Sequence, residues 1–165
     1  MRVQEACIWD ALAIGKLGTR YAEEACEYAG LDLDLECAIA NVSIAIHSPN
    51  SLVVVLISDS NEIVGFLWGV CGKSLPWTHE LIALDQIVYV LPEYRGSFGS
   101  VKLIKAYEAW ALDQGASEVR LSVASGIHED RTAGFYNKLG YTHLGSQQRR
   151  TLDVIRRHTR YTRST

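Results

Sequence analysis

A short run of small residues lies where the sequence passes from an apolar strand pattern to a helical pattern. The run reads Arg95-Gly96-Ser97-Phe98-Gly99-Ser100. The first amides of a helix have no intrahelical partners and carry a partial positive charge, so such a loop can close its N–H groups around an anion, usually a phosphate. Arg95 adds a fixed cation whose forked guanidinium suits a phosphate. The alternative is a plain turn in which the glycines only relieve strain.

A carboxylate at the start of the preceding apolar run could act as a base. Asp85 comes two residues before a stretch that reads Ile-Val-Tyr-Val, at 87–90, which is typical of a strand. By the two-residue period of a strand, Asp85 would share one face with Ile87 and Tyr89. Partial burial favours the protonated form of a carboxylate and makes it a better base. A carboxylate that is merely satisfied at a strand end is the alternative.

The residues around the loop resemble motif A of the GNAT N-acetyltransferases, in which the loop reads Q/R-x-x-G-x-G/A. The matching stretch is Val90-Leu91-Pro92-Glu93-Tyr94-Arg95-Gly96, followed by a helix start with small residues. The resemblance implies that the loop amides hold the pyrophosphate of coenzyme A. It also implies that a backbone N–H near Val88, Tyr89 or Val90 polarises the thioester carbonyl. Phe98 and Ser100 stand where the motif has small residues, so the Phe98 side chain must turn away from the phosphates.

A second stretch, from Arg131 to Tyr141, resembles motif B of the same family. Its Tyr136-x-x-x-Gly140-Tyr141 end matches the family pattern Y-x-x-x-G-F/Y, and Gly140 closes the helix. The resemblance implies that Tyr136 protonates the leaving thiolate, because a phenol with a pKa near 10 is protonated and can donate. A tyrosine that only packs in the core is the alternative. Glu129 stands where the family often has an asparagine, so no cofactor contact is expected from it.

The reaction implied by the resemblance is direct transfer of an acetyl group from acetyl-CoA to an amine of a small molecule or a protein, without a metal. The amine must lose a proton and the thiolate must gain one. Asp85 is the preferred base, and His79, Glu80 or a water relay are alternatives. The alternative function is a degenerate GNAT-fold module that binds or regulates with little or no turnover. The loop also resembles that of short phage acetyltransferases, and the family often forms dimers.

Hydrophobic periodicity predicts the elements that must position these residues. Strands are expected at 2–7, Leu52–Ile57, Ile63–Cys71, 87–90 and Ser117–Val123; helices at Trp9–Tyr28, Leu33–His47, Val101–Leu112 and from Arg131 to Gly140; and a closing pair of strands within Tyr141–Leu152. The resemblance implies a single α/β domain over residues 1–152. Its mixed, mostly antiparallel sheet is splayed at the motif A strand and flanked by helices. In this reading Trp77 borders the acceptor site and Trp9 packs in the core.

Composition narrows the class of protein. A chain of 165 residues with 48% hydrophobic and 21% charged residues predicts one globular domain. No apolar run is long enough to cross a bilayer, and the first residues lack the pattern of a signal peptide. The four cysteines, Cys7, Cys26, Cys37 and Cys71, form no C-x-x-C pair. They therefore predict reduced, mostly buried side chains, no metal site and a cytoplasmic protein.

The charge is unevenly distributed along the chain. Residues 149–165 hold six arginines and one aspartate, a net of +5, so the other residues carry −3 minus 5, or −8. The basic tail at 153–165 could contact nucleic acid or an acidic partner. A solvated, frayed terminus is the alternative. Nucleic acid is an unlikely partner because the acidic body would repel its phosphates.

Overall fold

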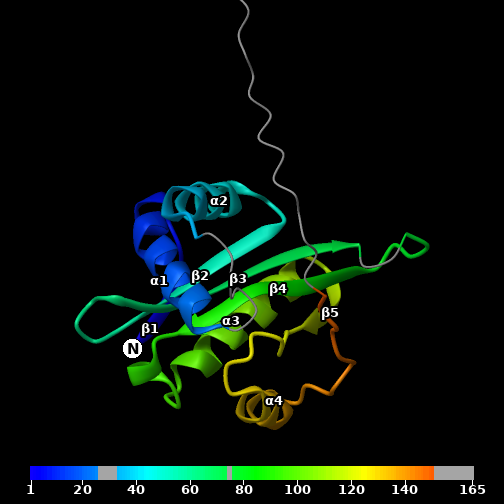
Figure 1. Ribbon diagram of the computed structural model, residues 1–165. Coiled ribbons are helices and arrows are strands. Elements are labelled where there is room, and N and C mark those ends of the chain that lie inside the picture. The colour runs from blue at the N-terminus through cyan, green and yellow to red at the C-terminus, as the bar shows by residue number, and fades with distance from the viewer. Residues whose placement is uncertain (26–32, 74–75, 151–165) are drawn as a thin grey trace, which may run out of the picture.

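The computed structural model describes residues 1–25, 33–73 and 76–150 of the chain. Within these ranges the chain forms five strands and four α-helices (Figure 1). In order they are β1 (Arg2–Glu5), α1 (Ala11–Glu24), α2 (Leu35–His47), β2 (Ser51–Ile57), β3 (Ile63–Lys73), β4 (Leu81–Val90), α3 (Gly99–Asp113), β5 (Ala116–Arg120) and α4 (Glu129–Lys138). Short 3-10 turns at Ile8–Asp10 and Pro92–Tyr94 precede α1 and follow β4.

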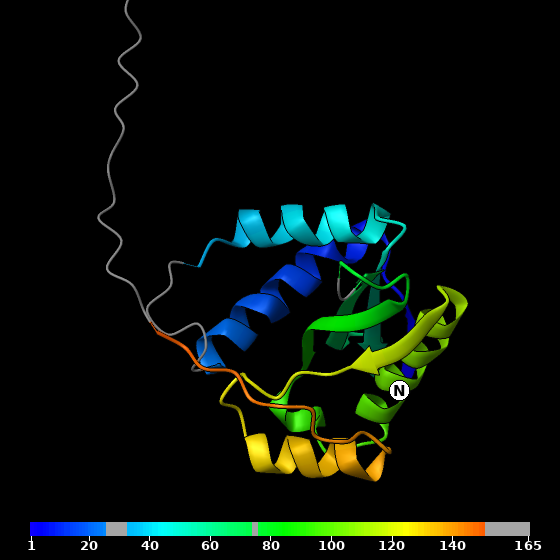
Figure 2. The same ribbon diagram turned by 90° about the vertical axis from the view of Figure 1, so that its right-hand side faces the viewer.

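The strands form one sheet in the order β1-β2-β3-β4-β5. The first three pairings are antiparallel, and only the pairing of β4 with β5 is parallel. Helices α1 and α2 lie on one face of the sheet and α3 lies on the other, while α4 lies below the region where β4 and β5 separate (Figures 1 and 2). This mixed, mostly antiparallel sheet confirms the fold class expected from the sequence.

The core lies between β2 and the helices that cover it. Each residue from Leu52 to Ile57 is at most 5% exposed, so β2 is buried on both faces, as its unbroken apolar run predicts. Helix α3 places Leu103, Ile104 and Tyr107 against the sheet, and all three are completely buried. These positions fall on one stripe of a 3.6-residue helix, which is why α3 can seal that face of the sheet.

Strand β4 contains the irregularity that shapes the functional site. Trp68 of β3 pairs with Ile87, whereas Gly69 pairs with Asp85, so Gln86 is an extra residue in β4. Such a β-bulge bends the strand and redirects the side chains beside it. The strict alternation from Asp85 to Ile87 that the sequence analysis predicts is therefore wrong, because the bulge interrupts it.

Strands β4 and β5 separate just beyond the pairing of Leu84 with Arg120. Two residues after Arg120, the N–H of Ser122 donates to Asp85 Oδ1 at 2.8 Å instead of to a backbone carbonyl of β4. The Ser122 hydroxyl donates to Asp85 Oδ2 at 3.0 Å. Because a side-chain carboxylate takes the place of a strand carbonyl, β5 ends at Arg120 and does not continue to Val123 as expected. The result is an open fork between the two strands, which is the splay that the sequence analysis expects.

The chain after α4 does not form the predicted closing strands in its described part. Residues 141–150 have no regular secondary structure, and all of them except Tyr141 are exposed. A half-buried strand needs apolar side chains on alternate positions, and from 142 to 150 only Leu144 is a large apolar residue. The remainder of the predicted pair and the basic tail at 153–165 lie outside the described residues.

Two predictions about burial are also wrong. Trp9 is 88% exposed rather than part of the core, because it lies in the 3-10 turn before α1 and not on the buried stripe of that helix. The free cysteines Cys7 and Cys37 are exposed, and Cys71 is the buried one of the three described. Cys26 and the predicted end of the first helix lie outside the described residues. In the described ranges, no helix combines the length and the apolar character that a membrane span requires.

Candidate active site

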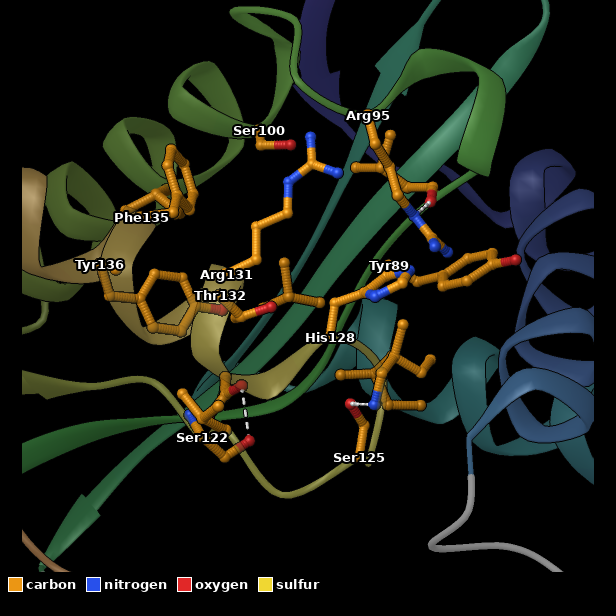
Figure 3. A pocket seen from close by; sticks show the side chains of 18 of the residues that line it. Tyr89, Arg95, Ser100, Ser122, Ser125, His128, Arg131, Thr132, Phe135 and Tyr136 are labelled. Carbon is orange, nitrogen blue, oxygen red and sulfur yellow. Dashed lines mark hydrogen bonds between the residues drawn. The ribbon is translucent and has the colours of Figure 1, made fainter.

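The fork between β4 and β5 opens into a cleft of about 610 Å³ (Figure 3). Its walls come from β4, the loop before α3, the segment after β5 and α4. Most residues predicted from the sequence line this cleft, namely Asp85, Val88, Tyr89, Val90, Arg95, Gly96, Ser97, Phe98, Ser100 and Tyr136. Gly99 is the exception, because it is buried at the start of α3. A concave site of this size suits a small molecule or an extended cofactor arm.

The two glycines of the loop occupy the positions where this backbone requires them. Gly96 has a φ of +78°, a conformation that other residues rarely adopt. A Cβ on Gly99 would lie 2.5 Å from Leu56 Cδ2, so a side chain there would push α3 away from β2. Phe98 has an ordinary φ of −66°, and its side chain is 83% exposed. The loop therefore needs no glycine at Phe98 or Ser100, where motif A has small residues.

Several amides at the start of α3 are open. Among the hydrogen bonds of the described residues, none engages the N–H groups of Ser97, Phe98, Ser100 or Val101. These four residues also line the cleft. Ser97 stabilises the turn by donating its hydroxyl to the Tyr94 carbonyl at 2.8 Å and accepting the Gly99 N–H at 3.2 Å. Open amides at a helix N-terminus form a site suited to an anion.

The guanidinium of Arg95 is tied to the end of α1. It forms a bidentate pair with Glu24, at 2.6 and 2.7 Å, and its Nε donates to the Val90 carbonyl at 2.8 Å. It also lies 5.4 Å from the centre of the Tyr89 ring, and the Tyr89 hydroxyl donates to Glu24 at 3.1 Å. The hydrogen bond from Arg95 holds the pKa of the Glu24 carboxyl below its usual value. Glu24 was not predicted from the sequence, since it lies 71 residues from Arg95.

A second arginine approaches the loop from the opposite wall. Arg131 lies in the first turn of α4, and its Nη2 would be 3.3 Å from a Cβ on Gly96. In Figure 3 its side chain extends from α4 toward Ser100, whereas the Arg95 side chain is directed toward Tyr89. The sequence analysis missed Arg131. The available signal was a cation in the first turn of a helix, where the helix dipole disfavours it.

His128 immediately precedes α4 and also lines the cleft. Its φ of 46° and ψ of 49° place it in the left-handed region, which is unusual for a residue other than glycine. Such strained residues often lie at functional sites. In Figure 3 the imidazole is directed toward Tyr89. The sequence offered no signal for His128.

Tyr136 contributes a nearly buried phenol to the cleft. It is 7% exposed, and its ring lies 5.7 Å from Phe135 and 5.9 Å from Tyr141, measured between ring centres. Burial raises the pKa of the Tyr136 hydroxyl above its usual value, and the negative charge of Asp85 raises it further. The phenol is therefore protonated near neutral pH and can serve as a hydrogen-bond donor.

Asp85 is the carboxylate at the fork, where Ser122 binds both of its oxygens. The alternative bases from the sequence analysis do not line the cleft: His79 is exposed, and Glu80 accepts a hydrogen bond from Ser117 at 2.9 Å outside it. Trp77 is also exposed and away from the cleft lining. Within the described part of the chain, no group of three or more His, Cys, Asp and Glu side chains could hold a metal ion.

The backbone of β4 directs alternate N–H groups into the fork. Leu91 donates its N–H to the Val64 carbonyl of β3 at 2.9 Å. Because alternate residues of a strand face the same neighbour, Tyr89 also directs its N–H to β3 and Val88 directs its own to the opposite edge. That edge is uncovered beyond Leu84, where β5 diverges. An N–H donor is thus available at Val88 in the middle of the cleft.

Comparison with known proteins identifies relatives of this arrangement. A model described as an acetyltransferase (GNAT) domain matches residues 49–143. A mutant of the BH1408 protein from Bacillus halodurans has a similar structure, with a TM-score of 0.75, 18% identity, and coverage of 92% of this chain and 99% of that one. The acetyltransferase Tb11.01.2886 from Trypanosoma brucei gives a TM-score of 0.69 at 19% identity, over 92% of this chain and 99% of that one.

Glucosamine-6-phosphate N-acetyltransferase from Arabidopsis thaliana gives a TM-score of 0.70 at 14% identity, over 92% of this chain and 98% of that one. Identities this low show a shared fold and nothing about a shared substrate. No curated protein matches the sequence.

Proposed function

Because this chain belongs to the GNAT acetyltransferase family, whose domain model matches residues 49–143, we propose that it transfers an acetyl group from acetyl-CoA to an amine of a small molecule or a protein. The observation that carries the proposal is the row of open amides at the start of α3, in residues that line the same cleft as Tyr136. An anion site and a proton donor in one cleft are what a phosphate-bearing acyl donor with a thiol leaving group requires.

The residues of the cleft suit this donor. The amides of Ser97, Phe98, Ser100 and Val101 are available to the diphosphate, and Gly96 and Gly99 give the loop its conformation. Acetyl-CoA supplies the acetyl group in activated form, as a thioester. The N–H of Val88 is the donor we assign to the thioester carbonyl, because a fixed backbone donor stabilises the charge that develops on that oxygen. Arg95 supports this strand end through Val90 and Glu24.

Two proton transfers complete the reaction. Asp85, directly or through a water, accepts the proton that the attacking amine loses, because an ammonium has no lone pair for attack. The amine nitrogen then forms a bond to the carbonyl carbon, the carbon–sulfur bond breaks, and its electron pair remains on the sulfur. Tyr136 donates its hydroxyl proton to that sulfur and recovers a proton from solvent. The nitrogen still carries an extra proton after the attack and releases it to solvent as the amide forms. Asp85 returns the first amine proton to solvent, so both groups end as they began.

Calorimetric titration with acetyl-CoA, followed by a screen for coenzyme A release with amines and proteins as acceptors, tests the proposal. We expect saturable binding with one site per chain and turnover with at least one class of acceptor. Absence of binding would refute the proposal. Binding without turnover above the uncatalysed rate for any acceptor would favour a binding or regulatory module.

Asp85→Asn should lower turnover about a hundredfold, within the usual range for loss of an acid–base group. The amide cannot take up a proton, so the acidic limb of the pH–rate profile should also flatten. The amide oxygen of the new side chain can still accept the Ser122 N–H, which limits damage to the fork. Ser122→Ala is the matched control: it removes the bond to Asp85 Oδ2 but keeps the carboxylate, so it should keep the acidic limb. An unaltered profile in Asp85→Asn would assign the base to another group.

A further inference from the structure

The cleft contains two arginines whose surroundings differ. Arg95 comes from the loop itself, whereas Arg131 reaches the loop from α4. We propose that Arg131, and not Arg95, is the side chain that binds the phosphates of the acyl donor. Arg95 is instead a positioning residue that holds the end of β4. This inference rests on the proposed function, because it assigns a ligand group to the same cleft.

The contacts of Arg95 leave it poorly suited to a phosphate. Its Nε and both Nη atoms already donate hydrogen bonds, to the Val90 carbonyl and to the two carboxylate oxygens of Glu24. The pair neutralises its charge, and the bond to Glu24 raises the pKa of its guanidinium further. A phosphate placed beside Arg95 would also meet the negative charge of Glu24. Three of its five N–H groups are engaged in this way, so a phosphate could replace the bidentate contact only by breaking a partly buried ion pair, which is costly.

Arg131 has the opposite properties. Its side chain is exposed, and across the described ranges no carboxylate forms an ion pair with it. Its Nη2 approaches the loop at Gly96, where a Cβ would lie only 3.3 Å away. The open amides of Ser97, Phe98 and Ser100 follow directly in the loop. A free forked guanidinium beside open amides gives the charge and geometry that a diphosphate needs.

The position of Arg131 within α4 supports the same assignment. The partial positive charge at a helix start disfavours a cation there, although Glu129 and Asp130 in the same turn offset part of that penalty. A bound diphosphate would lie between this helix start and the start of α3, beside the Arg131 guanidinium. The donor would then connect two walls of the cleft, the loop and α4, through one pair of phosphates. Tyr136 lies on the same helix, five residues further on, so fixing α4 would also fix the phenol.

Titrations of coenzyme A and of pantetheine, which has the thiol arm but no phosphates, test the assignment. Arg131→Gln should weaken coenzyme A binding by roughly tenfold to a hundredfold, the range for hydrogen bonds to a charged group. It should leave pantetheine affinity and the melting temperature unchanged, because Arg131 is exposed and unpaired in the described structure. Lys16→Gln, which removes the same charge from the exposed face of α1, should change none of these values.

Arg95→Gln distinguishes the two roles. If Arg95 is a positioning residue, Arg95→Gln should weaken the binding of coenzyme A and of pantetheine by a similar factor. It should also lower the melting temperature of the unliganded protein. A loss confined to coenzyme A in Arg95→Gln, with Arg131→Gln unchanged, would overturn the inference and leave the proposed function intact. Failure of the unmodified protein to bind coenzyme A would overturn both.

Discussion

Replacing Tyr136 by phenylalanine should lower turnover by about a hundredfold or more, as expected for loss of a general acid. Affinity for acetyl-CoA should hardly change, because the phenylalanine ring keeps the packing against Phe135 and Tyr141. The hydroxyl matters only when the carbon–sulfur bond breaks, so its loss should appear in kcat and not in binding. Steady-state kinetics combined with calorimetry would separate the two.

Tyr141→Phe provides the matched control. Tyr141 neighbours Tyr136, but its hydroxyl donates to Glu108 at 3.0 Å and it is not part of the cleft lining. Removing that hydroxyl should leave kcat within a few-fold of the original. Equal losses in both variants would indicate a packing effect, and full activity in Tyr136→Phe would remove the phenol from the mechanism.

The pH dependence provides an independent check on Tyr136. Burial and the charge of Asp85 raise the pKa of this phenol above its usual value of about 10. The acid form is therefore present throughout the neutral and moderately alkaline range. Ionisation of Tyr136 should cause no fall in turnover below about pH 10.

The second large effect is expected at Gly69, beneath the bulge of β4. A Cβ there would lie 2.6 Å from Tyr107 Cζ and 2.7 Å from its hydroxyl, and closer still to Cε2. Tyr107 is completely buried and stacks on Trp110, so its ring can move away only by disturbing that packing. Gly69→Ala should therefore lower the free energy of unfolding by about 2 to 3 kcal/mol, as for other overpacked cores. Urea unfolding would measure the change.

Gly72→Ala is the control for this substitution, since it lies in the same strand and a Cβ there would meet nothing within 4 Å. It should be neutral or slightly stabilising, because glycine is unfavourable within a strand. Gly69 pairs with Asp85 at the bulge, so its replacement should also weaken acetyl-CoA binding. Equal stability of the two alanine variants would show that Tyr107 can move.

Local patterns in the sequence predicted much of the fold and part of the site. The strand, loop and helix from residue 87 to Leu112 were found because apolar periodicity and glycine position depend on neighbouring residues. The same holds for α4 and its end at Gly140, which has a φ of +94°. The loop residues and Tyr136 could be predicted as site residues because motifs A and B, which these stretches resemble, are short continuous runs of the chain. Their chemical roles remain predictions.

The parts that escaped prediction depend on distant residues. Glu24 binds Arg95, and Ser122 ends β5 by binding Asp85. Neither contact can be recognised from the residues that surround Glu24 or Ser122 in the sequence. The bulge at Gln86 likewise can be recognised only from the pairing of β4 with β3. The prediction of closing strands is wrong for residues 141–150, because this stretch has few apolar side chains to bury after Tyr141.

The pair between Glu24 and Arg95 also bears on how this protein could be re-engineered. An obvious route to a new acceptor would be a chimera that takes its first 50 residues from a relative and keeps the remainder. Such a graft would remove the Glu24 carboxylate, which binds Tyr89 and Arg95 and, through Arg95, stabilises the end of β4. The two halves are therefore not interchangeable modules. A working graft has to retain an acidic residue at position 24, or replace Arg95 with a neutral side chain at the same time.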